Sequence, residues 1–212
     1  MRKKIKAIIF DFDGTIADTL PYTFEKIIEI ARKYKIKEEN KIIEKLRSMT
    51  PNELLRSFNI SWLKYPFIIW DIKKAQKLLF YHLDKIKVFS GIKKVLQLLN
   101  KKNIKVFIYS SNLKKNIDYF LEKNDLKKYF EKVYVGNNLL GKYKDLKNIL
   151  KKERLKKNEV VYVADEIRDV LACKKVGIKM IGVGWGLAGE KNLKKYKVDF
   201  IIKKPLEIIK VV

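Results

Sequence analysis

Two aspartates after the first apolar segment are the residues of this sequence best placed to do chemistry. Asp11 and Asp13 belong to the motif FDFDGT and directly follow an apolar segment at residues 6–10. In an extended chain, residues i and i+2 point to the same side, so both carboxylates would face one point at the strand end. They would repel each other unless a cation or a shared proton compensates them. A hard cation such as Mg²⁺ suits this pair, although a DxD pattern alone is more typical of a polar turn.

Other reactive groups follow three later segments of the chain. Asp165 and Asp169 would lie one turn apart and flank the same point if a helix begins between them. A hydroxyl, an ammonium group and a pair of acids at the ends of neighbouring strands are improbable as a chance arrangement. These groups are Ser111 with Asn112, Lys142 after Gly141, and Asp165 with Asp169.

Short apolar segments alternate with amphipathic segments of helical spacing. Strands separated by single helices form right-handed crossovers and a parallel sheet covered on both faces. The predicted fold class is therefore α/β, with a Rossmann-like parallel sheet whose ligands bind beyond the carboxyl ends of the strands. The predicted strands are residues 6–10, 104–110, 132–135, 160–164, 179–183 and 199–202, and the predicted helices between them are residues 92–100, 117–123, 146–152 and 170–176.

Residues 16–88 interrupt this alternation, because they show helical patterns and almost no strand pattern. Thr50 followed by Pro51 is typical of a helix start. A long amphipathic pattern covers residues 67–86, and a shorter one covers residues 23–34. We therefore predict a catalytic core formed by residues 1–15 and 89–212, with an all-helical cap, residues 16–88, inserted after the first strand.

The composition excludes several classes of protein. The 49 Lys and Arg exceed the 24 Asp and Glu by 25 charges, yet only six are Arg and the lysines are scattered. Arg is the better reader of phosphates and bases, so we expect no specific nucleic-acid partner. A single cysteine, Cys173, excludes an internal disulfide. No apolar stretch approaches the roughly 18–20 residues of a membrane span. We expect a cytoplasmic protein with no membrane partner, and the sequence leaves the oligomeric state open.

The four motifs together resemble those of the haloacid dehalogenase superfamily, in particular its phosphoglycolate-phosphatase-like branch with a small helical cap. DFDGTIADTLP is similar to the first family motif, YSSN to the second, GK to the third and VADEIRD to the fourth. The resemblance covers nearly the whole chain. It implies a phosphatase that hydrolyses a small anionic phosphomonoester, with Mg²⁺ as cofactor and an aspartyl-phosphate intermediate.

The resemblance also implies catalytic and phosphate-binding roles for the matching residues. Asp11 would be the nucleophile that attacks phosphorus. Asp13 would be the general acid for the leaving oxygen and then the base that activates water. Ser111 and the backbone of Asn112 would bind the phosphoryl oxygens. Lys142 would neutralise charge between Asp11 and the phosphoryl group.

The metal ligands are implied in the same way. Mg²⁺ would bind Asp11, the backbone carbonyl of Asp13 and the carboxylate of Asp165, with Asp169 supporting it through water or a further hydrogen bond. Glu166 is either another ligand or an acid favoured at a helix start.

Two departures from the family pattern leave alternatives open. The third motif reads GKYKDLK, so Lys144 is an alternative to Lys142, and Ala164 stands where the family usually has Gly. A phosphomutase or phosphonate hydrolase of the same superfamily is an alternative function, because the cap decides between them. A catalytically silent, Lys-rich binding protein on the same fold is an alternative of another class.

Overall fold

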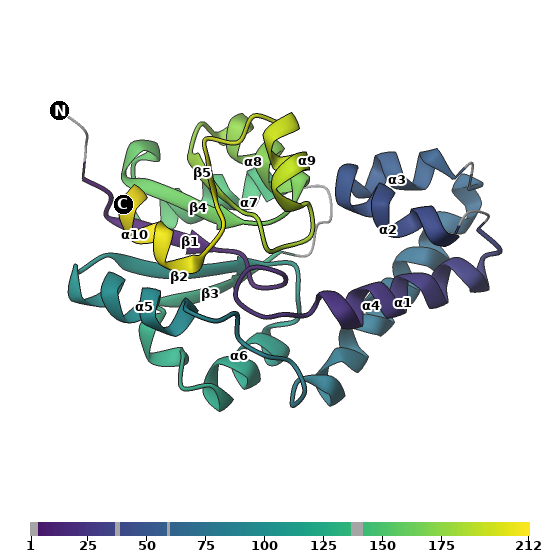
Figure 1. Ribbon diagram of the computed structural model, residues 1–212, viewed down its shortest axis with the longest axis horizontal. Coiled ribbons are helices and arrows are strands. Elements are labelled where there is room, and N and C mark those ends of the chain that lie inside the picture. The colour runs from purple at the N-terminus through teal and green to yellow at the C-terminus, as the bar shows by residue number, and fades with distance from the viewer. Residues whose placement is uncertain (1–3, 37–38, 59, 137–141) are drawn as a thin grey trace.

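A six-stranded parallel sheet forms the centre of the computed structural model, which describes residues 4–36, 39–58, 60–136 and 142–212. The strand order is β3-β2-β1-β4-β5-β6, and every neighbouring pair is parallel (Figure 1). The predicted α/β class and parallel sheet are therefore confirmed. The strands are β1 (Ala7–Phe10), β2 (Lys105–Ser110), β3 (Lys132–Val135), β4 (Val160–Ala164), β5 (Lys179–Val183) and β6 (Phe200–Ile202).

Helices cover both faces of the sheet, which explains why the strands are apolar without alternation. In β1, Ile8 and Phe10 join one apolar cluster, whereas Ala7 and Ile9 join the other. The first face is covered by α5 (Ile92–Lys101), α6 (Lys114–Lys123) and α10 (Ile208–Val211). The second face is covered by α7 (Lys142–Lys152), α8 (Ile167–Val176) and α9 (Gly189–Lys195).

The order of the strands sets the position of the site. β1 lies between β2 and β4, and the chain builds the sheet outward from β1 to β3 before it crosses to β4. Parallel strands present their carboxyl ends at one edge, and ligands bind where the direction of winding reverses. The segments that follow β1, β2 and β4 therefore meet, and these segments carry the motifs singled out above.

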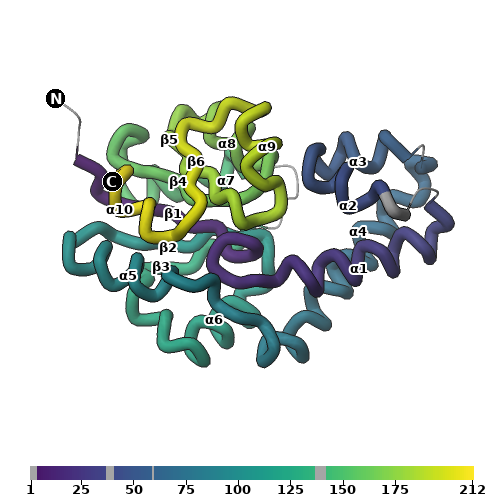
Figure 2. Tube along the Cα trace, viewed as in Figure 1, coloured from purple at the N-terminus to yellow at the C-terminus, as the bar shows by residue number. Residues whose placement is uncertain are grey.

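A group of helices lies beyond this edge of the sheet (Figures 1 and 2). The chain enters and leaves the group through adjacent segments, joined by an antiparallel bridge between Ala17 and Val88. The amide of Phe89 also donates to the carbonyl of Ile16 at 3.0 Å. These helices are α1 (Leu20–Lys33), α2 (Glu39–Ser48), α3 (Pro51–Ser57) and α4 (Tyr65–Leu78).

The helix predicted for residues 67–86 is shorter in the structure. α4 ends at Leu78 and the chain continues as a 3₁₀ turn, Leu79–His82. Leu79 and Leu83 are buried in the apolar cluster of the sheet, and this packing outweighs the helical pattern of the local sequence. Because the insert and the sheet share this cluster, the limits 16–88 of the cap stay a prediction. None of the described helices has the length and apolar character needed to cross a membrane.

Helix α3 begins where the Thr50-Pro51 pair predicted a helix start, and a capping box with Glu53 closes its first turn. The Glu53 amide donates to the Thr50 hydroxyl at 3.4 Å, and the Thr50 amide donates to the Glu53 carboxylate at 2.7 Å. We expect Thr50→Ala to lower the free energy of unfolding by about 1 kcal/mol in a urea titration. Ser61 stands before a short 3₁₀ turn and makes no capping bond, so Ser61→Ala is expected to cost less than about 0.5 kcal/mol. Equal losses would contradict the capping role.

Candidate active site

The ammonium group of Lys142 lies between two carboxylates, that of Asp11 directly after β1 and that of Asp169 in the first turn of α8. Lys142 Nζ donates to Asp11 Oδ2 at 2.9 Å and to Asp169 Oδ1 at 2.6 Å. All three side chains are at most 3% exposed. Burial alone would lower the pKa of Lys142, but the Asp11 and Asp169 carboxylates raise it above its ordinary value, so the ammonium group stays charged.

The structure separates the two lysines of the third motif. Lys142 is the first residue of α7, and its side chain points inward to the carboxylates. Lys144 lies on the same helix and is exposed. The glycine of this motif, Gly141, lies outside the described residues.

Asp13 is held by the side chain of Asn112. Asn112 Nδ2 lies 3.0 Å from each carboxylate oxygen of Asp13. The side chain of Asn112 is oriented in turn by two hydrogen bonds that its Oδ1 accepts. The donors are the backbone N–H of Leu113 at 2.7 Å and Asn116 Nδ2 at 2.9 Å. Loss of solvent, followed by repulsion from Asp11, raises the pKa of Asp13 to about 6. A carboxyl group with this pKa can donate and accept a proton near neutral pH.

Arg168 lies beside the predicted phosphate-binding hydroxyl. Its guanidinium forms a two-point ion pair with Glu166, with Nε 2.5 Å from Oε2 and Nη2 2.7 Å from Oε1. Nη2 also lies 3.3 Å from the hydroxyl of Ser111. Burial would raise the pKa of Glu166, but Arg168 and Lys142 together lower it. Glu166 is therefore an ionised carboxylate at the site.

Three carboxylates converge closely enough to share a cation. Asp11, Glu166 and Asp169 each offer an oxygen, and these atoms lie within 4.8 Å of one another. Asp169 Oδ2 is buried without a hydrogen-bond partner. Burial, opposed by Lys142 and reinforced by Asp11, raises the pKa of Asp169 to about 7. An oxygen-only donor set with one unsatisfied buried oxygen fits Mg²⁺.

Asp165 is buried next to this group, but its carboxylate has other partners. Oδ1 accepts from the Thr15 hydroxyl at 3.1 Å, and Oδ2 accepts from the Leu187 amide at 2.7 Å. Burial, followed by repulsion from Glu166, raises its pKa well above the ordinary value. Gly14 has a φ of +68°, and a Cβ there would lie 2.2 Å from Asp165 Oδ2. The turn after β1 therefore needs glycine both for its backbone conformation and for the approach of Asp165.

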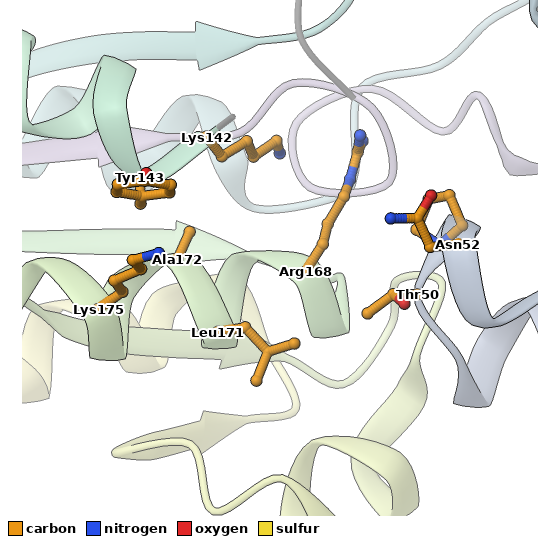
Figure 3. Close-up of a pocket in the computed structure, with 9 residues that line it drawn as sticks. Thr50, Asn52, Lys142, Tyr143, Arg168, Leu171, Ala172 and Lys175 are labelled. Atoms are coloured by element: carbon orange, nitrogen blue, oxygen red, sulfur yellow. The ribbon is translucent and has the colours of Figure 1, made fainter. Parts of the chain in front are cut away.

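A cleft opens beside these residues, between α8 and the start of α3 (Figure 3). It has a volume of about 240 Å³. Figure 3 shows Lys142 and Arg168 extending toward the same space, with Thr50 and Asn52 on the opposite side. The helical insert thus contributes one wall of the site. The lining residues are Thr50, Pro51, Asn52, Lys142, Tyr143, Arg168, Leu171, Ala172 and Lys175.

Comparison with known proteins agrees with this geometry. The family model described as "Haloacid dehalogenase-like hydrolase" matches residues 8–183. The chain belongs to this family. The phosphoglycolate phosphatase of Synechococcus elongatus is 29% identical over 216 residues, covering 98% of this chain and 97% of that protein. The pyrophosphatase PpaX of Anoxybacillus flavithermus is 21% identical and covers 98% and 96%, respectively.

A solved structure supports the fold of this haloacid dehalogenase-like hydrolase. The haloacid dehalogenase-like family hydrolase from Streptococcus pneumoniae matches with a TM-score of 0.80 at 18% identity, covering 98% of each chain. The predicted superfamily, its phosphoglycolate-phosphatase-like branch and the phosphatase class of enzyme are confirmed.

Two contacts of this hydrolase were not foreseen from the sequence. The prediction assigned only the backbone of Asn112, whereas its side chain positions Asp13. The sequence predicts no role for Arg168, although it is one of only six Arg and lies inside the fourth motif. That scarcity, within a motif of acids, is the one signal by which the sequence could have indicated it.

Proposed function

We propose that the protein is a Mg²⁺-dependent phosphohydrolase that cleaves a small phosphomonoester through an aspartyl-phosphate on Asp11. The observation that carries this proposal is the position of Asp11, which is buried against the ammonium group of Lys142. Asp13 follows two residues later, with a pKa of about 6. A nucleophile, a compensating cation and a proton donor therefore stand at one strand end, as phosphoryl transfer requires.

The reaction has two steps in this proposal. A carboxylate oxygen of Asp11 attacks phosphorus, the bond to the leaving oxygen breaks, and Asp13 gives that oxygen its proton. Asp13 then removes a proton from water, which attacks phosphorus and releases phosphate, restoring the Asp11 carboxylate. The phosphoryl oxygens are stabilised in both steps by the Ser111 hydroxyl, the backbone N–H of Asn112 and the ammonium group of Lys142.

The donor set leaves two arrangements for Mg²⁺. The resemblance favours Asp11, the backbone carbonyl of Asp13, and Asp165, with Asp169 in support. The convergence of Asp11, Glu166 and Asp169 supports Glu166 as a further ligand. When bound, the ion supplies positive charge opposite the phosphoryl oxygens.

The helical insert acts as a cap in this proposal. Its Thr50 and Asn52 face Arg168 across the cleft, and it joins the core through two adjacent segments at Ala17 and Val88. Closure over Asp11 would exclude water other than the nucleophile and select the leaving group.

The test is phosphate release from phosphoglycolate, glycerol 3-phosphate, a nucleoside monophosphate and pyrophosphate. Each is assayed with 5 mM Mg²⁺ and again with excess EDTA. We expect turnover of at least one monoester that EDTA removes and added Mg²⁺ restores. Turnover that resists EDTA would overturn the metal requirement. Absence of release from all four compounds and from 6-phosphogluconate would overturn the phosphohydrolase itself.

The pH profile tests the role of Asp13. General acid catalysis needs the protonated form, whose fraction falls about tenfold per pH unit above a pKa of about 6. We expect kcat/KM for an alkyl phosphate to fall correspondingly on the alkaline side. Asp13→Asn is expected to lower kcat/KM by about 10²- to 10⁴-fold and to remove its fall at alkaline pH.

p-Nitrophenyl phosphate is the matched control for this profile, because its leaving group needs little protonation. In Asp13→Asn, the rate of phosphoryl transfer from p-nitrophenyl phosphate to Asp11 is expected to fall far less than the rate of transfer from an alkyl phosphate. A rapid burst of p-nitrophenol would reveal this difference. Equal losses in the rate of transfer from both substrates would contradict proton donation by Asp13.

A further inference from the structure

We infer that the substrate carries a second anionic group, which Lys175 binds in the cleft between α8 and α3, while Arg168 contacts the part of the substrate that lies nearer Asp11. This inference rests on the proposed function and deepens it, because it names the class of organic phosphate. The cleft begins at Lys142, which contacts Asp11, and continues along one face of α8. Residues 168, 171, 172 and 175 share that face by their spacing.

The charge of the cleft is one-sided. Among the described residues that line it, three carry a positive charge and none carries a carboxylate. Lys142 is already paired with Asp11 and Asp169. Arg168 is paired with Glu166 but keeps an unused donor, so it and Lys175 are the two cations left to contact a ligand in the remainder of the cleft. A ligand seated there is favoured if it is anionic.

Arg168 has donor capacity that the protein does not use. Nη2 donates to Glu166 Oε1, and Nε lies within ion-pair distance of Glu166 Oε2 without forming a hydrogen bond, whereas Nη1 is buried and has no hydrogen-bond partner at all. A buried N–H group without an acceptor is destabilising, more so on a charged group. A carboxylate or phosphate oxygen of a ligand would satisfy it with a charge-assisted hydrogen bond.

Lys175 is placed at the far end of the same face. Its Nζ lies 3.9 Å from the centre of the Tyr143 ring, which also lines the cleft. The ion pairs among the described residues include none for Lys175. The ring holds the ammonium group at the cleft, where it is available to an anion.

The spacing of the two cations defines the length of the ligand. Seven residues of helix correspond to about 10 Å along the axis of α8. The surface between them is formed by Leu171 and Ala172, which offer no charge. Pyrophosphate, whose two phosphorus atoms share one oxygen, is too short to span this separation. The geometry suits an organic phosphate whose carboxylate or second phosphate is several bonds from the first.

Paired substrates that differ only in the distal group test this inference. 6-Phosphogluconate ends in a carboxylate, and sorbitol 6-phosphate has a hydroxymethyl group at the same place. We expect the wild type to favour 6-phosphogluconate by at least about tenfold in kcat/KM, mainly through KM. Lys175→Gln is expected to reduce this preference to about twofold. A wild-type ratio near one, or a ratio unaffected by Lys175→Gln, would overturn the inference.

Lys147→Gln is the matched control. Lys147 also lies over the Tyr143 ring, at 6.0 Å, but it does not line the cleft. Its replacement removes the same charge from the same surface, and the preference for 6-phosphogluconate is expected to stay at the wild-type value. An equal drop in both variants would indicate general electrostatic attraction and contradict a specific subsite.

Calorimetry separates failure of this inference from failure of the proposed function. Binding of 6-phosphogluconate is measured with the wild type and with Lys175→Gln, without any need for turnover. A loss of affinity of about fivefold or more in the variant supports the subsite even if no phosphate is released. Equal affinities overturn the subsite. Hydrolysis of both sugar phosphates without preference would leave the phosphohydrolase intact and remove only the second anionic group.

Discussion

Asp11→Asn is expected to reduce Mg²⁺-dependent phosphate release by about 10⁴-fold or more. An amide oxygen is a poor nucleophile toward phosphorus, so no covalent intermediate forms, and loss of a nucleophile is among the largest effects of a single substitution. The change preserves the shape of the side chain, and its oxygen can still accept the hydrogen bond from the Phe12 amide, 2.8 Å long in the wild type. Steady-state phosphate release at saturating Mg²⁺ gives the measurement.

The matched control for this variant is Asp125→Asn. Asp125 is 75% exposed, and its backbone has a φ of 54°, a conformation that asparagine adopts readily. We expect wild-type turnover from it. A second readout is the transfer of ³²P from labelled substrate to the acid-quenched protein, expected for the wild type and absent in Asp11→Asn. Retained turnover or retained labelling in Asp11→Asn would contradict the assignment of the nucleophile.

The parts of the fold that the sequence predicts are those that depend on local pattern. β3, β4 and β5 have the predicted limits. For β4 and β5 the reason is that an apolar run covered on both faces leaves a clear signal in the sequence. Helix α2 has no predicted counterpart, and α4 ends earlier than its pattern suggests. Leu79 and Leu83 continue the helical spacing, but they are buried in the apolar cluster on one face of the sheet, and this long-range packing is not visible in a local pattern.

In the candidate site, too, some features follow from the sequence pattern and others depend on long-range contacts. Acids and hydroxyls at the ends of parallel strands can be predicted to meet, because topology alone brings those ends together. Which partner each group has depends on loop conformation. Asn112 supports Asp13 across 99 residues of sequence, and Arg168 reaches Ser111 across 57. Neither contact follows from residue type or spacing.

The sequence of the third motif likewise does not decide between Lys142 and Lys144. Replacing each lysine separately tests which of them acts at the site. Lys142→Met is expected to lower kcat by about 10³-fold, because the ammonium group beside Asp11 is lost where charge builds up in the transition state. Lys144→Met makes the same chemical change on the exposed side of α7, and we expect little effect on kcat from it. A larger loss from Lys144→Met would reverse the assignment.

Stability provides an independent readout of Lys142. Removing it leaves the buried carboxylates of Asp11 and Asp169 without their shared cation, a change that costs about 3–5 kcal/mol when one partner of a buried ion pair is deleted. The pKa of Asp169, already raised to about 7, would rise further without Lys142. A carboxyl group with a raised pKa in the folded state binds protons more tightly there than in the unfolded state. The amount by which it lowers the free energy of unfolding therefore decreases as the pH falls. The loss caused by Lys142→Met, measured by urea titration, is therefore expected to be larger at pH 8 than at pH 5. A loss independent of pH would show that Lys142 acts through packing rather than as the counter-ion of the two carboxylates.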